Sequence, residues 1–126
     1  MDPNELALIS KHVAGYNDAI RQAAAARANV HLVDTNAMLG QIAAVGYPVP
    51  GTTVTLTTRY DGGVFSLDGI HPSDTGYGIV ANEFIRVLNG EIQRALTAGK
   101  ASGFGGLRAQ IPSVDVKAIH NNDVMR

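Results

Sequence analysis

The chain of 126 residues is 45% hydrophobic and 17% charged, a composition that indicates one soluble globular domain and excludes disorder throughout. Its net charge of -1, with ten scattered lysines and arginines, argues against a nucleic-acid partner or an anionic membrane surface. Because it has no cysteine, it can form neither a disulfide nor a thiolate metal site, and no apolar run approaches the roughly 18 residues of a membrane span.

Residues 3–27 are predicted to form the first helix. Asp2 can cap it, Pro3 suits the first helical position, and Glu5 lies three residues after the cap. The apolar residues that follow recur every three or four positions: Leu6, Ile9, Val13, Tyr16 and Ile20. Residues 30–34 then switch to a short apolar run that predicts a buried strand of a parallel sheet. A helix that leads into such a strand is half of a parallel α/β unit.

The middle of the chain is predicted to contain shorter elements. Thr35 or Asn36 can cap a helix over residues 37–45. Residues 54–60 alternate between apolar and polar side chains, as a strand does. Residues 61–66 can turn the chain back as the second arm of a small β-hairpin.

A second long helix is predicted over residues 73–98. Ser73 is a good N-cap, and apolar side chains follow it at helical spacing, with Asn89-Gly90 as a weak point in the middle. Residues 99–106 are rich in glycine and predict a flexible linker. The last twenty residues are predicted either to form a strand or to stay loose.

Asp68 and His71 are the one group of residues in this sequence whose types and spacing indicate a catalytic site. Pro72 biases His71 towards an extended backbone, so residues 68–71 are predicted to be a short loop that leads into the second long helix. Such a loop can present a carboxylate and an imidazole at a cleft. In a hydrolytic triad, the carboxylate holds the imidazole in one tautomer while the imidazole takes the proton from a serine hydroxyl.

The stretch around this pair reads Phe65-Ser66-Leu67-Asp68-Gly69-Ile70-His71-Pro72, followed by Gly76-Tyr77, Ile79, Ala81-Asn82 and Phe84-Ile85. It resembles the last sequence block of the GDSL (SGNH) family of serine esterases and lipases, and the resemblance covers about residues 5 to 98. It implies that residues 1–98 are the carboxyl-terminal portion of an SGNH hydrolase-like domain, followed by a glycine-rich linker and tail at 99–126. The implied fold is α/β, a partial flavodoxin-like three-layer arrangement in which helices flank a parallel sheet, with a small β-hairpin excursion.

The resemblance also implies the site. Asp68 would orient His71, and His71 would be the general base in the hydrolysis of a small-molecule ester, with no cofactor and no metal. The family's G-D-S nucleophile block is missing, however, and none of the five serines lies in a strand-to-helix turn of that type. The hydroxyl of Ser73 is expected to cap the helix instead of acting as a nucleophile.

Other candidate site residues have ordinary structural explanations. The string Gly15-Tyr16-Asn17-Asp18 matches the family's G-x-N-D oxyanion block but lies inside the first predicted helix, so we expect it to be helix surface. The remaining histidines, His12, His31 and His120, lack the spacing of metal ligands. Asp34 can line a cleft or cap the next turn, and a cap is the commoner use of such a residue.

Two hypotheses follow. The chain is either the acid-base half of a GDSL-type ester hydrolase, as a fragment or with a serine borrowed from elsewhere, or an inactive binding or assembly module. A G-D-S block encoded upstream of Met1 would favour the first. An unpaired edge at residues 30–33 would invite a second copy, so we expect a homo-oligomer, most simply a dimer that pairs these edges or swaps residues 107–126. The N-terminus predicts no secretory signal and leaves the localisation open.

Overall fold

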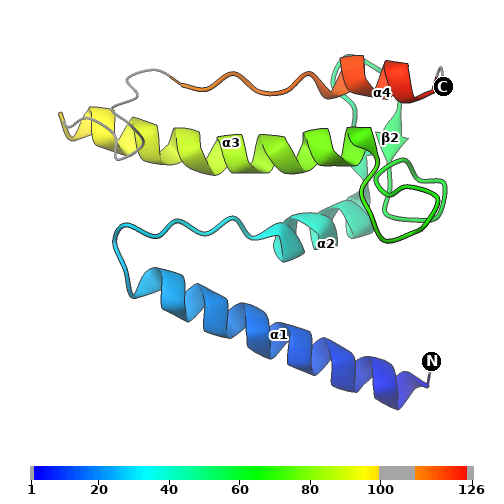
Figure 1. Ribbon diagram of the computed structural model, residues 1–126, viewed down its shortest axis with the longest axis horizontal. Coiled ribbons are helices and arrows are strands. Elements are labelled where there is room, and N and C mark those ends of the chain that lie inside the picture. Colours follow the sequence, from blue (N-terminus) through cyan, green and yellow to red (C-terminus); the bar gives the residue numbers. More distant parts are fainter. Residues whose placement is uncertain (1, 100–109, 125–126) are drawn as a thin grey trace. The chain divides into compact units, whose positions relative to one another are not determined.

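The structure is a computed structural model that describes residues 2–99 and 110–124 (Figure 1). The chain divides into two units, residues 1–32 and 33–126, and each is described by itself. The first unit contains helix α1 (Pro3–Ala25). The second contains α2 (Thr35–Val45), β1 (Tyr47–Pro48), β2 (Thr55–Leu56), α3 (Asp74–Thr97) and α4 (Val116–Val124).

Helix α1 begins as predicted and ends two residues earlier than expected. The Asp2 carboxylate accepts the N–H of Asn4 at 2.9 Å, and the Glu5 carboxylate accepts the N–H of Asp2 at 2.9 Å. Side chains therefore satisfy backbone donors that the first turn leaves without partners. No residue of α1 is buried. Its apolar side chains, which we call the α1 stripe, are exposed along the whole helix: Leu6, Ile9, Val13, Tyr16 and Ile20.

The parallel strand predicted at residues 30–34 does not form, and the predicted α/β fold is wrong. These residues have no regular secondary structure, and Val30 is 43% exposed. A buried parallel strand needs neighbouring strands to take up its N–H and C=O groups. In the described part of the chain, the sheet is the two-stranded antiparallel pair of β1 and β2. The flavodoxin-like three-layer arrangement with a parallel sheet is therefore absent from the described residues, which are mostly helical.

The β-hairpin predicted over residues 54–66 pairs differently from the expectation. Strand β2 pairs with β1, with Tyr47 opposite Leu56. The chain after β2 closes into a loop, in which the N–H of Thr57 donates to the carbonyl oxygen of Gly62 at 2.7 Å. Alternation of side chains indicates an extended backbone but does not show which segment lies beside it. The burial of Leu56 in the core belongs to the pairing with β1.

The core of the second unit joins its three helices to the loops between them. Its buried side chains are Ile42, Val49, Leu56, Val64, Ile79 and Val116. Four partly buried side chains pack against this cluster: Met38, Leu39, Tyr47 and Phe65. Because Val64 is in the core, the backbone that enters the Asp68–His71 loop starts from a packed position.

Polar side chains cap the N-termini of α2 and α3. The Asp34 carboxylate accepts the N–H of Ala37 at 2.9 Å, so Asp34 caps α2, the commoner of the two uses considered above. The prediction that Thr35 or Asn36 caps this helix is wrong, because the helix already begins at Thr35. The Ser73 hydroxyl accepts the N–H of Gly76 at 2.9 Å and caps α3. Helix α3 runs without a break through Asn89-Gly90, which confirms the second long helix.

The segment before α4 is held to α3 by two asparagines. The Asn82 side chain donates to the carbonyl oxygen of Val114 at 3.0 Å and accepts its N–H at 2.6 Å. Asn89 does the same with Ile111, at 2.8 and 2.7 Å. Residues seven apart lie on one helix face, so the segment runs along α3 (Figure 1). Residues 110–124 therefore form neither the predicted strand nor a loose tail, because they run along α3 and end in helix α4. The linker predicted at 99–106 lies, apart from Gly99, outside the described residues.

Candidate functional site

Residues 66–71, which we call the dyad loop, connect the core residue Val64 to helix α3. The N–H of Ser66 donates to the carbonyl oxygen of His71 at 2.8 Å, so the two ends of the loop are joined. Inside it, the N–H of Gly69 donates to the carbonyl oxygen of Ser66 at 3.0 Å. Gly69 has a φ of 69°, a left-handed conformation that costs glycine little. The loop is therefore closed by its own backbone.

The structure brings the two predicted site residues together. His71 Nδ1 lies 2.6 Å from Asp68 Oδ2. The other carboxylate oxygen, Oδ1, accepts the backbone N–H groups of Ile70 and His71, both at 2.9 Å, and the hydroxyl of Ser66 at 2.7 Å. An ionised carboxylate accepts hydrogen bonds only, so Nδ1 carries the proton in this contact. The neutral imidazole then has an unprotonated Nε2, as a general base requires.

These hydrogen bonds lower the pKa of Asp68 well below its usual range. The largest cause is the contact with the His71 ring, followed by the Ser66 hydroxyl and then the backbone N–H groups of Ile70 and His71. Each favours the charged carboxylate. The pKa of Asp68 is lower in the folded chain than in the unfolded chain. The contacts therefore stabilise the folded loop at pH values above the pKa of an ordinary aspartate, about 3.9. That contribution is lost as the pH falls through the lowered folded-state pKa.

The dyad is open to solvent. The side chain of His71 is 71% exposed and that of Asp68 is 48% exposed. Large apolar residues flank them on the same loop: Leu67 and Ile70 are each 74% exposed. A reacting group can therefore approach the imidazole from solvent, and apolar surface lies beside it.

The two serines near the dyad in sequence, Ser66 and Ser73, direct their hydroxyls to groups other than the imidazole of His71. The Ser66 hydroxyl donates to Asp68, not to the imidazole. The Ser73 hydroxyl donates to the carbonyl oxygen of Gly63 at 2.7 Å, in addition to its role as a cap. Ser10 lies in the other unit and Ser113 is exposed in the segment before α4, while Ser102 lies outside the described residues.

Ser66 is the site residue that the sequence interpretation missed. Ser66 belongs to the motif, but the resemblance assigns it no role. Its spacing was a usable signal, because serine and aspartate side chains commonly hydrogen-bond to groups two or three residues away. In this loop that local tendency places Ser66, Asp68 and His71 in one hydrogen-bonded chain.

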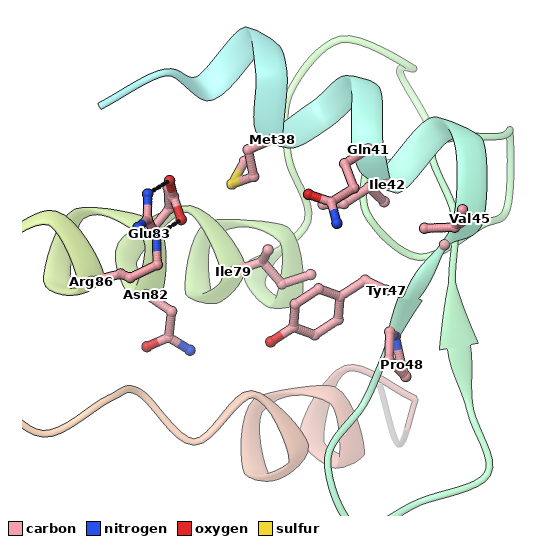
Figure 2. A pocket seen from close by; sticks show the side chains of 11 residues that line it. Met38, Gln41, Ile42, Val45, Tyr47, Pro48, Ile79, Asn82, Glu83 and Arg86 are labelled. Atoms are coloured by element: carbon pink, nitrogen blue, oxygen red, sulfur yellow. Dashed lines mark hydrogen bonds and ion pairs between the residues drawn. The ribbon is translucent and has the colours of Figure 1, made fainter. Parts of the chain in front are cut away.

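A pocket of about 380 Å³ lies elsewhere in the second unit, among α2, β1 and α3 (Figure 2). Met38, Ile42 and Ile79 form apolar walls. At one end, the Arg86 guanidinium binds the Glu83 carboxylate through two hydrogen bonds of 2.7 and 2.8 Å and lowers the pKa of Glu83. These opposite charges neutralise each other. Neither Asp68 nor His71 lines the pocket, so it is not the cleft of the dyad.

The G-x-N-D string at residues 15–18 is part of the helix surface, as expected. Asn17 lies within α1, and the neighbouring Asp18 binds Arg21 at 2.7 Å on the helix surface. Among the residues that the structure describes, no three His, Cys, Asp or Glu side chains are grouped so that they could hold a metal ion. In the same residues, no helix combines the length and apolar character needed to cross a membrane.

Comparisons with protein-family models, with curated proteins and with solved structures found no match. The functional interpretation therefore depends on the sequence motif and on the geometry of the dyad loop.

Proposed function

We propose that the dyad loop is the acid-base half of a serine ester hydrolase of the GDSL (SGNH) type. His71 is the general base and Asp68 is the carboxylate that orients it. The observation that carries this proposal is the 2.6 Å contact between His71 Nδ1 and Asp68 Oδ2, with Oδ1 held by three donors. The same carboxylate that faces the imidazole is therefore fixed by groups of its own loop.

The chemistry assigned to the pair is proton transfer. His71 Nε2 takes the proton from a nucleophilic hydroxyl as that oxygen attacks the ester carbonyl, and later gives it to the leaving alcohol. Asp68 keeps the proton on Nδ1 and stabilises the imidazolium that forms. The nucleophile has to come from a segment other than those that contact His71 in the described structure. The substrate class is a small-molecule ester.

Hydrolysis of p-nitrophenyl acetate by the full chain tests this assignment. We expect the rate to be low, because the chain has no recognisable nucleophile and lacks the blocks that supply the family's oxyanion hole. In enzymes that lose triad members, that hole and substrate binding preserve a roughly 10³–10⁴-fold acceleration. We expect His71→Ala to remove most of the remaining imidazole-dependent rate, whereas His12→Ala, at an exposed histidine of α1, leaves it nearly unchanged.

Two outcomes would contradict parts of this proposal. Equal effects of the two histidine variants would show that Asp68 does not make His71 a better base than an ordinary surface histidine. Fast turnover that disappears in His71→Ala, together with phosphonate labelling of one serine, would show that the chain has its own nucleophile.

The second candidate, an assembly module, is favoured by the α1 stripe. Its five apolar side chains are between 41% and 68% exposed. Exposed apolar surface of this extent on one helix is typical of an interface. The edge pairing expected at residues 30–33 is not available, because these residues form no strand. Nothing within the described residues 2–32 buries the α1 stripe, and we propose that a second copy of the chain covers it.

Size exclusion with light scattering tests the assembly directly. We expect a dimer mass for the full chain and a monomer mass for Val13→Glu, because a charge in the stripe would be buried without a partner. Ala14→Glu places the same charge beside the stripe and is expected to remain a dimer. A wild-type mass of one chain at micromolar concentration would exclude this dimer.

A further inference from the structure

We propose that Ser66 is a positioning residue of the dyad: its hydroxyl holds the Asp68 carboxylate in the orientation that places Oδ2 against His71 Nδ1. This inference depends on the proposed function, because it names the third member of that site. The hydroxyl lies 2.7 Å from Oδ1 and acts on the imidazole only through the carboxylate.

The carboxylate needs such support because its last torsion angle is soft. The χ2 angle of aspartate has a broad, roughly two-fold distribution, so the carboxyl group rotates easily when nothing holds it. The two N–H groups of Ile70 and His71 approach Oδ1 from the backbone of the loop. Because the Asp68 side chain is 48% exposed, water competes for the same oxygen. Unlike a water molecule, the Ser66 hydroxyl is attached to the loop and stays next to Oδ1.

Ser66 is fixed independently of its side chain. Its N–H donates to the carbonyl oxygen of His71, and its own carbonyl oxygen accepts the N–H of Gly69. A substitution that removes the hydroxyl therefore leaves both backbone contacts of this residue available. The effect of the hydroxyl on the dyad can then be separated from the closure of the loop.

The same geometry argues against Ser66 as the nucleophile. A serine hydroxyl has one proton to donate, and this one is donated to Asp68. A nucleophilic serine has to offer that proton to the imidazole. The contact thus assigns Ser66 to the supporting side of the site.

NMR of the full chain tests the proposal with four variants. Ser66→Ala removes the hydroxyl, and the pair Ser66→Thr and Ser66→Val differ by the hydroxyl at nearly equal shape. Ser113→Ala removes an exposed serine of the same unit as a control. Two signals are followed: the titration of the Asp68 carboxyl carbon, and the exchange of the His71 Nδ1 proton with water.

We expect Ser66→Ala and Ser66→Val to shift the Asp68 titration upward, towards that of an ordinary aspartate, and to speed the exchange of the Nδ1 proton. Ser66→Thr and Ser113→Ala are expected to match the wild type. Unchanged signals in Ser66→Val relative to Ser66→Thr would overturn the proposal, and this comparison holds even if Ser66→Ala fails to fold.

The two signals report on the dyad and not on ester hydrolysis. If the two signals differ between Ser66→Val and Ser66→Thr while His71→Ala leaves hydrolysis unchanged, Ser66 positions the dyad and the proposed hydrolase function is wrong. If His71→Ala lowers the rate of hydrolysis while the two signals are the same in Ser66→Val and Ser66→Thr, only the positioning role is wrong.

Discussion

A Gly76→Ala variant of the full chain is expected to be less stable than the wild type by about 3 kcal/mol, the upper range for overpacking. A Cβ atom at this position would lie 2.1 Å from the carbonyl oxygen of Val64 and 3.0 Å from Cβ of Pro72. The carbonyl oxygen belongs to the backbone and also accepts the N–H of Ser73 at 3.0 Å, so it cannot move aside without weakening the start of α3.

Gly90→Ala is the matched control in the same helix. Nothing lies within 4 Å of a Cβ atom built at Gly90. Alanine there loses less backbone freedom on folding, so we expect this variant to be more stable by roughly 0.5–1 kcal/mol. Urea unfolding followed by circular dichroism measures both changes. A Gly76→Ala variant at least as stable as the wild type would mean that the close approach of α3 to Val64 is wrong.

In Asp68→Asn, the neutral His71 ring is expected to change its tautomer. The backbone N–H groups of Ile70 and His71 require an acceptor where Oδ1 now lies, so the amide oxygen takes that position. The amide nitrogen then faces Nδ1 and donates to it. The ring proton has to move to Nε2, and Nε2 can no longer accept a proton from a hydroxyl. In a complete triad, this change costs roughly 10⁴-fold in rate.

Nitrogen chemical shifts of the His71 ring distinguish the two tautomers directly. Asp61→Asn is a suitable control, because Asp61 lies in an exposed turn with a φ of 61°, where asparagine is tolerated. We expect the wild type and this control to carry the proton on Nδ1, and Asp68→Asn to carry it on Nε2. A wild-type ring already protonated on Nε2 would contradict the assigned contact with Asp68.

The predictions that the structure confirms concern interactions within three residues of one another. Asp2, Glu5 and Ser73 satisfy helix donors in their own first turn, so their sequence spacing is enough to place the starts of α1 and α3. Asp68 and His71 belong to the same class of interaction. They lie three residues apart beside a proline, which leaves the backbone few ways to separate them.

The interactions that the sequence could not predict join distant segments. Residues 30–34 have the composition of a buried strand, but a strand forms only where another segment offers its hydrogen-bonding groups, and none does in the described residues. No sequence pattern predicts the long-range contacts that Asn82 and Asn89 make. These asparagines bind Val114 and Ile111, 32 and 22 residues away, because the fold brings that segment alongside α3.

The sequence by itself therefore determined the starts of α1 and α3, the loop between Val64 and α3, and the pairing of Asp68 with His71. Only the tertiary structure decided that β2 lies beside β1, that Val64 anchors the dyad loop in the core, and that α3 holds the segment before α4. The physical reason is how far apart along the sequence the interacting groups lie. Local hydrogen bonds depend on spacing along the chain, whereas strand partners and core contacts depend on which distant surfaces meet and exclude water.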